Sequence, residues 1–174
     1  MNLNTALLLV DVQAKMFAPF KPVHEADDYL EKFQKLLRLS RASGTPVIFV
    51  QNNGQVGEAD ETRTEGWLLH PEIEIENGDL IVQKAQFEPF TGTELHSVLQ
   101  KKGIHKLIIA GLQSETCIAA TCRKANELGY GVTLVSDAHS TYGTDGKNAE
   151  DVINRINLDL KDLVSLWRVS DVEI

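Results

Sequence analysis

The sequence has few positive charges and no long apolar run. It contains 17 Lys and Arg against 25 Asp and Glu, which gives a formal net charge of −8 over 174 residues. Because nucleic acids and anionic membranes bind clustered positive charge, we expect neither as a partner. The apolar stretch at residues 6–10 is short and is followed by Asp11, so we expect no membrane segment and no signal peptide.

Cysteine is scarce as well, since Cys117 and Cys122 are the only two. They lie five residues apart on one predicted helix, point in different directions and would not easily form a disulfide. We therefore expect a reducing, cytoplasmic setting. Cys122 lies on an apolar stripe, and we predict that it belongs to the core.

Short apolar runs alternate with amphipathic segments, and we find no repeat, low-complexity tract or linker. The pattern predicts strands at 5–11, 46–51, 79–83, 106–110, 132–136 and 163–167, and helices at 26–43, 92–101, 114–128 and 146–161. Such alternation favours an α/β fold with a parallel sheet covered on both faces, in a single domain over residues 1–174. Residues 52–78 show little periodicity, and we interpret them as a long functional loop.

Three reactive side chains stand at or just after predicted strand ends. Asp11 closes the first strand, Lys84 follows the third and Cys117 follows the fourth. In an open parallel sheet, ligands bind beyond the carboxyl ends of the strands, so we expect the three at one edge. Cys117 also falls in the first turn of a predicted helix, where free N–H groups and the helix dipole favour a thiolate.

This trio predicts nucleophilic catalysis. Asp11 could take the thiol proton, Lys84 could hold Asp11 and offset negative charge, and N–H groups at the helix start could stabilise an oxyanion. Together these groups indicate an amide hydrolase that works through a thioester without a metal or cofactor. Each residue also has a plain structural interpretation: Asp11 as a helix cap, Lys84 as a solvated side chain and Cys117 as a small core residue.

Two other classes of function stand beside the hydrolase. A nucleotide- or phosphate-binding module is disfavoured, because the first strand leads into DVQAKMF rather than a glycine-rich turn. A ligand-binding protein of the same fold without turnover is the main alternative, and only an assay separates it from an enzyme.

Three segments resemble the isochorismatase-like cysteine hydrolases, a family that includes nicotinamidases, N-carbamoylsarcosine amidases and ureidoacrylate hydrolases. ALLLVDVQAKMF resembles the segment with the catalytic Asp, at Asp11. IVQKAQFEPFTGTEL resembles the segment with the catalytic Lys, at Lys84, and AGLQSETCIAATCRKANELGYGVTLVSDAHST resembles the nucleophile segment, at Cys117. The resemblance implies a three-layer αβα fold with a six-stranded, mostly parallel sheet, and a homo-oligomer, either dimer or tetramer.

The resemblance also implies an oxyanion hole formed by the N–H groups of Gln113 and Cys117, with a non-proline cis peptide between Leu112 and Gln113. Nicotinamidases carry an Asp-x-His zinc motif after the second strand, where residues 51–53 here read Gln-Asn-Asn. Amides are poor zinc ligands, so we expect no metal and a substrate other than nicotinamide. The isochorismatases proper lack the cysteine, so its presence argues against isochorismate as substrate.

Position near the strand ends and the resemblance together predict a pocket for a small-molecule substrate. The candidates are polar and aromatic side chains in the segments that follow the strands: Gln13, Phe17, Gln51, Asn53, Trp67, Phe87 and His139. Gln51 and Asn53 could bind a carbamoyl or amide group, or could cap the loop. Phe17 and Phe87 could equally be core residues, and His139 could line the mouth or cap the approach to the last predicted helix.

Overall fold

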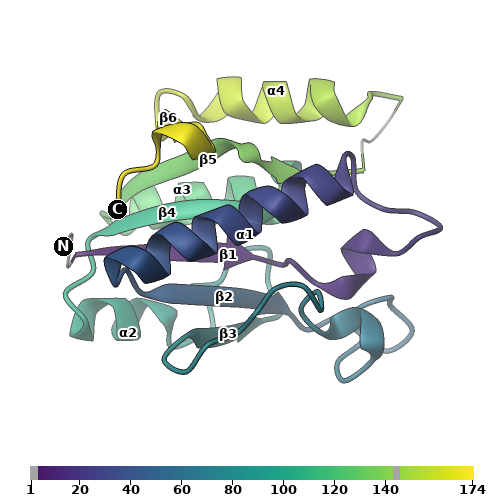
Figure 1. Ribbon diagram of the computed structural model, residues 1–174, viewed down its shortest axis with the longest axis horizontal. Coiled ribbons are helices and arrows are strands. Elements are labelled where there is room, and N and C mark those ends of the chain that lie inside the picture. The colour runs from purple at the N-terminus through teal and green to yellow at the C-terminus, as the bar shows by residue number, and fades with distance from the viewer. Residues whose placement is uncertain (1–3, 143–145) are drawn as a thin grey trace.

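The computed structural model describes residues 4–142 and 146–174. Six parallel strands form one sheet in the order β3-β2-β1-β4-β5-β6 (Figure 1). The strands are β1 (Thr5–Val10), β2 (Val47–Asn52), β3 (Leu80–Lys84), β4 (Lys106–Leu112), β5 (Gly131–Ser140) and β6 (Ser165–Trp167). The predicted α/β class and six-stranded sheet are confirmed. No helix within the described ranges has both the length and the apolar character needed to cross a membrane.

Helices cover both faces of this sheet, which explains why β1 is apolar from Ala6 to Val10. Leu7 and Leu9 pack on the face covered by α1 (Ala26–Ser43), and Leu8 packs on the opposite face with α2 (Leu95–Lys101) and α3 (Ala119–Glu127). In Figure 1, α1 crosses in front of the sheet and α3 lies behind it. The fourth helix, α4 (Ala149–Leu160), packs against β5 and α3.

The helices begin and end where local chemistry allows. A buried apolar stripe defines α1, and Gly44, with φ of 73°, ends it in a left-handed conformation. Asn148 caps α4 by accepting the N–H of Asp151 at 2.8 Å. The second helix starts at Leu95, three residues later than predicted, because the Thr93 hydroxyl accepts the N–H of Leu95 after a turn at Gly92.

The fourth and fifth strands run further than predicted. Gly111 does not end β4, which continues through it to Leu112. A Cβ at Gly111 would lie 2.1 Å from the carbonyl oxygen of Val10, so the two strands approach as only glycine permits. The extension of β4 pairs with an extension of β5, in which Gly111 faces His139.

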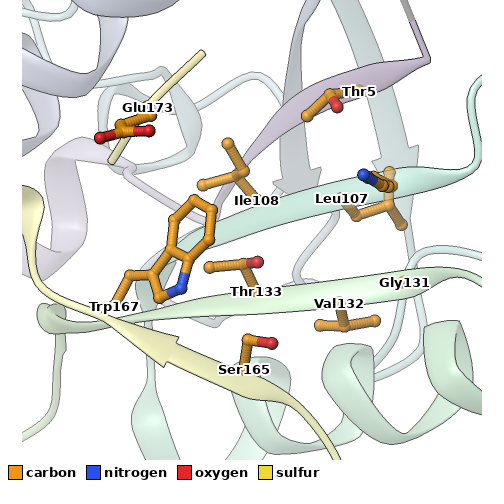
Figure 2. A pocket seen from close by; sticks show the side chains of 10 residues that line it. Thr5, Leu107, Ile108, Gly131, Val132, Thr133, Ser165, Trp167 and Glu173 are labelled. Atoms are coloured by element: carbon orange, nitrogen blue, oxygen red, sulfur yellow. The ribbon is translucent and has the colours of Figure 1, made fainter. Parts of the chain in front are cut away.

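The two ends of the sheet differ in what they carry. The strand order changes direction at β1, so the crevice beyond the carboxyl ends of β1 and β4 is the expected ligand site in such a sheet. At the opposite end, a cavity of about 220 Å³ lies among the first residues of β1, β4, β5 and β6, where Trp167 and Glu173 flank it (Figure 2). This cavity contains none of the residues predicted to carry chemistry.

Candidate active site

Asp11, Lys84 and Cys117 come together at the carboxyl edge of the sheet. Asp11 directly follows β1, Lys84 is the last residue of β3, and Cys117 lies in a wide π-helical turn, Ser114–Ile118, between β4 and α3. The Nζ atom of Lys84 lies 2.9 Å from Oδ2 of Asp11 and 3.5 Å from Sγ of Cys117. Because β3 is an edge strand, the long lysine side chain has to reach past the end of β2 to make both contacts.

The charged pair in this trio is shielded from water. The side chains of Lys84 and Asp11 are 0% and 1% exposed, whereas Cys117 is partly exposed. Lys84 occupies Oδ2 of Asp11, and Oδ1 makes no hydrogen bond among the described residues. Asp11 and Cys117 are close enough for each to alter the pKa of the other.

Burial acts on the pKa of each charged partner, with different results. Burial raises the pKa of Asp11 by more than the neighbouring ammonium lowers it. For Lys84, burial alone would lower the pKa, but the charge of Asp11, with a further contribution from Cys117, outweighs burial, and the pKa is raised. Lys84 therefore remains a cation in the dry interior.

The prediction that Cys117 rests as a thiolate is wrong. Burial and the charge of Asp11 together raise the pKa of Cys117 to about 11, although Lys84 acts to lower it. At neutral pH the sulfur therefore keeps its proton until a base removes it, and the raised pKa of Asp11 makes that carboxylate a stronger base for the purpose.

The backbone that leads into Cys117 is tightly organised. The peptide bond between Leu112 and Gln113 is cis, the form that the resemblance implies. The carbonyl of Gln113 accepts the N–H groups of Thr116 and Ile118 at 3.3 and 3.1 Å. Assignment of the N–H groups of Gln113 and Cys117 to an oxyanion hole stays a prediction.

Four of the predicted pocket residues hold the 52–78 loop against the sheet edge. Gln13, fully buried, donates to the carbonyls of Asn52 and Trp67 at 3.0 and 2.9 Å and accepts the N–H of Asn52 at 2.9 Å. Gln51 donates to the same Trp67 carbonyl at 2.9 Å, and the Trp67 indole donates to Asn53 at 2.8 Å. These groups are occupied within the protein, and their contact with a substrate stays a prediction.

The other three pocket candidates lie in different surroundings. Phe17 is partly buried, with its ring 4.7 Å from that of His70. Phe87 is 68% exposed and is therefore not a core residue. His139 is 0% exposed and contacts Ser114 and Asn157 at 2.8 and 3.1 Å. The expectation that His139 lines the mouth is wrong, because β5 continues past it and turns it inward.

Three further polar residues extend the trio and were missed in the sequence. Asn52, the last residue of β2, accepts a hydrogen bond from Lys84 at 3.1 Å and donates to Asp60 at 2.8 Å. Asp60, 2% exposed, forms an ion pair with Lys15 at 2.5 Å. Attention to every polar residue at a strand end would have found Asn52. No local signal separates Asp60 from the other acidic residues of its loop.

The side chains of Gln51, Asn52 and Asn53, where the resemblance sets the zinc motif of nicotinamidases, are engaged as amides in these hydrogen bonds. Over residues 4–142 and 146–174, no three His, Cys, Asp or Glu side chains gather in a group that could hold a metal ion. The expectation of a site without metal or cofactor stays a prediction.

Similar proteins were found by sequence and by structure. A family model described as the isochorismatase domain matches residues 5–162. Two streptothricin hydrolases from Streptomyces noursei are 36% identical over 97% of this chain and 39% identical over 79% of it. The chain spans only 61% and 54% of the length of these relatives. A putative isochorismatase hydrolase from Oleispira antarctica superimposes with a TM-score of 0.90 at 28% identity, covering 98% of this chain and 96% of that one.

Proposed function

The chain belongs to the isochorismatase family, and from this premise we propose that it hydrolyses a C–N bond of a small amide, ureide or related compound with Cys117 as nucleophile. One observation carries the proposal. A fully buried ammonium, that of Lys84, touches both a carboxylate and a partly exposed thiol, at 2.9 and 3.5 Å. Such an arrangement supplies a nucleophile, a base and a fixed counter-charge at one edge of the sheet.

In the proposed first half-reaction, the carboxylate of Asp11 removes the thiol proton as Sγ attacks the substrate carbonyl carbon. The carbonyl oxygen becomes an oxyanion, which we assign to the N–H groups of Gln113 and Cys117. Loss of one such donor costs about 3 kcal/mol in other hydrolases. When the intermediate collapses, the C–N bond breaks, the proton held by Asp11 passes to the leaving nitrogen, and a thioester remains on Cys117.

The second half-reaction uses the same groups in reverse order. Asp11 removes a proton from water, whose oxygen attacks the thioester carbonyl. The C–S bond then breaks, the acid leaves and the sulfur regains its proton. Throughout, Lys84 balances a negative charge that moves between Asp11 and Cys117, which suits its position between them.

The most direct test is a screen of small amides and ureides, with streptothricin included because two relatives are named for its hydrolysis. We expect Cys117→Ala to lower kcat by about 10⁴-fold or more. Cys122→Ala, which removes the other, fully buried thiol, serves as the matched control and should retain turnover. Mass spectrometry should detect an acyl group on Cys117. Turnover by Cys117→Ala would remove the thioester mechanism.

The setting of the enzyme also belongs to this proposal. We propose a homo-oligomer that acts on a small molecule in the cytoplasm, where the two free thiols would stay reduced. Light scattering on the purified protein tests the assembly, and a monomer at micromolar concentration would contradict it.

A further inference from the structure

The ammonium of Lys84 has three N–H donors, and the structure gives it three acceptors. These are Oδ2 of Asp11 at 2.9 Å, Oδ1 of Asn52 at 3.1 Å and Sγ of Cys117 at 3.5 Å. Two of the three belong to the proposed chemistry. The third, Asn52, touches no reacting atom, yet it fixes the direction of the remaining donor and thereby the orientation of the whole group.

An asparagine side chain can fulfil this role in only one of its two orientations. If the amide were flipped, its NH₂ group would face the ammonium, donor against donor. Asp60 excludes that orientation, because its carboxylate only accepts hydrogen bonds and receives the NH₂ group of Asn52 at 2.8 Å. Asp60 thus turns the amide oxygen of Asn52 toward Lys84.

Asp60 is itself held in place and in its charged form. Burial would raise its pKa, but the ion pair with Lys15 and the hydrogen bond from Asn52 outweigh burial and lower it. The backbone closes tightly around it: the N–H of Gly54 donates to the carbonyl of Asp60 at 3.0 Å, and a Cβ at Gly54 would meet the Asp60 side chain at 2.4 Å. The 52–78 loop is therefore folded around this carboxylate.

We propose that Asn52 and Asp60 are positioning residues, through which the 52–78 loop orients the Lys84 ammonium toward Asp11 and Cys117. Each contact in the chain that runs from Lys15 through Asp60, Asn52 and Lys84 to Asp11 joins a hydrogen-bond donor to an acceptor. The inference rests on the proposed function for its catalytic meaning, but its effect on the thiol can be measured without any substrate.

The test measures the rate of alkylation of Cys117 by iodoacetamide between about pH 7 and 9.5, with mass spectrometry to separate it from Cys122. Asn52→Leu keeps the net charge but removes the acceptor, so Lys84 should stabilise the thiolate less well. We expect alkylation about threefold to tenfold slower at each pH, which corresponds to a rise of the thiol pKa by up to about one unit. On a substrate from the amide screen, kcat should fall about tenfold to hundredfold with little change in KM.

Asp60→Asn distinguishes a positioning role from the effect of the Asp60 charge on the thiolate. The two predict changes of opposite sign in the alkylation rate of Cys117. Removal of a nearby negative charge would by itself favour the thiolate and speed alkylation. Loss of the carboxylate that orients Asn52 should instead slow it, by about twofold to tenfold. The double variant Asn52→Leu/Asp60→Asn should be no slower than Asn52→Leu alone, since Asp60 acts through Asn52.

Asp79→Asn is the matched control, because it removes a carboxylate from another shielded ion pair, with Arg41 at 2.9 Å, away from the trio. It should lose some thermal stability and keep the wild-type alkylation profile. Faster alkylation in Asp60→Asn, additive effects in the double variant, or wild-type profiles in folded variants would overturn the inference. Because Asp60→Asn keeps the size and shape of the side chain, its alkylation rate can still test the inference if Asn52→Leu does not fold.

The two proposals fail in different ways. If Cys117→Ala still hydrolyses the substrate, the proposed function falls, whatever the alkylation rates show. If hydrolysis depends on Cys117 but Asn52→Leu and Asp60→Asn alkylate and turn over like the wild type, only the positioning role falls.

Discussion

Two buried polar networks meet the same short turn, Ser114–Ile118, and they solve the problem of burial differently. Through Cys117, the turn contacts Lys84 and the charged network around Asp11. Through Ser114, it contacts His139, whose other ring nitrogen faces Asn157. The first network carries opposite charges in contact, whereas the second joins neutral hydrogen-bonding groups.

The two buried bases nevertheless end with pKa values shifted in opposite directions. Burial acts to lower the pKa of both, but Lys84 faces a carboxylate and its pKa is raised. His139 faces a hydroxyl and an amide, and burial lowers its pKa to about 4 against weaker upward effects of Asn157 and Asp137. Whether a buried base keeps its proton therefore depends more on the side chain that it contacts than on how deeply it is buried.

Removal of the base, Asp11, from the charged network should cause the largest loss of activity. Asp11→Asn keeps the shape of the side chain but cannot accept the thiol proton, so kcat/KM should fall by about 10⁴-fold. Asp137→Asn is the control, because it makes the same change at a carboxylate beside the other network, where Asp137 accepts the N–H of Val169 at 2.8 Å, and its activity should stay within a few-fold of the wild type. Equal activity of the two variants would contradict the role of Asp11.

The next effect concerns stability. Lys84→Met leaves the Asp11 carboxylate buried without its counter-charge, which should lower the free energy of unfolding at pH 7 by about 3–5 kcal/mol in urea denaturation. The double variant Lys84→Met/Asp11→Leu removes both charges and should recover most of that loss. A single variant as stable as the wild type would show that the pair is less well shielded than the structure indicates.

The buried, neutral His139 should make the free energy of unfolding depend on pH. Unfolded His139 binds a proton below about pH 6.5, whereas the folded protein holds it neutral down to about pH 4. The unfolded state therefore binds more protons in this window, and stability should fall by up to about 3 kcal/mol as the pH drops from about 6.5 to 4. His139→Gln should flatten that slope, whereas His105→Gln, at an exposed position, should leave it unchanged.

The smallest effect should come from a single neutral hydrogen bond. Ser114→Ala leaves a ring nitrogen of His139 without its partner, at a cost of about 1 kcal/mol in the free energy of unfolding. Ser97→Ala removes an exposed hydrogen bond to the carbonyl of Glu94 and should cost under about 0.5 kcal/mol. A larger loss in Ser97→Ala than in Ser114→Ala would reverse the expected order.

The features that could be predicted from the sequence are those that depend on the local pattern of apolar and polar residues. Hydrophobic periodicity located α1 to the residue, and the rule that ligands bind at the carboxyl ends of parallel strands brought Asp11, Lys84 and Cys117 to one edge. Strand ends were harder, because the continuation of β4 depends on how closely Gly111 approaches Val10, which no window of sequence contains.

The sequence was weakest where long-range contacts decide a residue's role. Nothing in the sequence indicated that the amides of Gln13 and Gln51 bind the carbonyl of Trp67, on the far side of a long loop, and the contact of these residues with a substrate stays a prediction. Likewise the charge state of Cys117 follows from burial and from Asp11, more than a hundred residues away. Asp60 stands among other acidic residues in the sequence and differs from them only in the folded loop.

The contact between Gly111 and Val10 has a consequence for engineering. Main chain meets main chain there, with no side chain between the strand that leads to Asp11 and the strand that leads to the Cys117 turn. The spacing of those two segments is thus a property of the backbone itself. Extensive redesign of the hydrophobic layers above and below the sheet should leave that spacing intact, so the scaffold tolerates new cores more readily than any replacement of this one glycine.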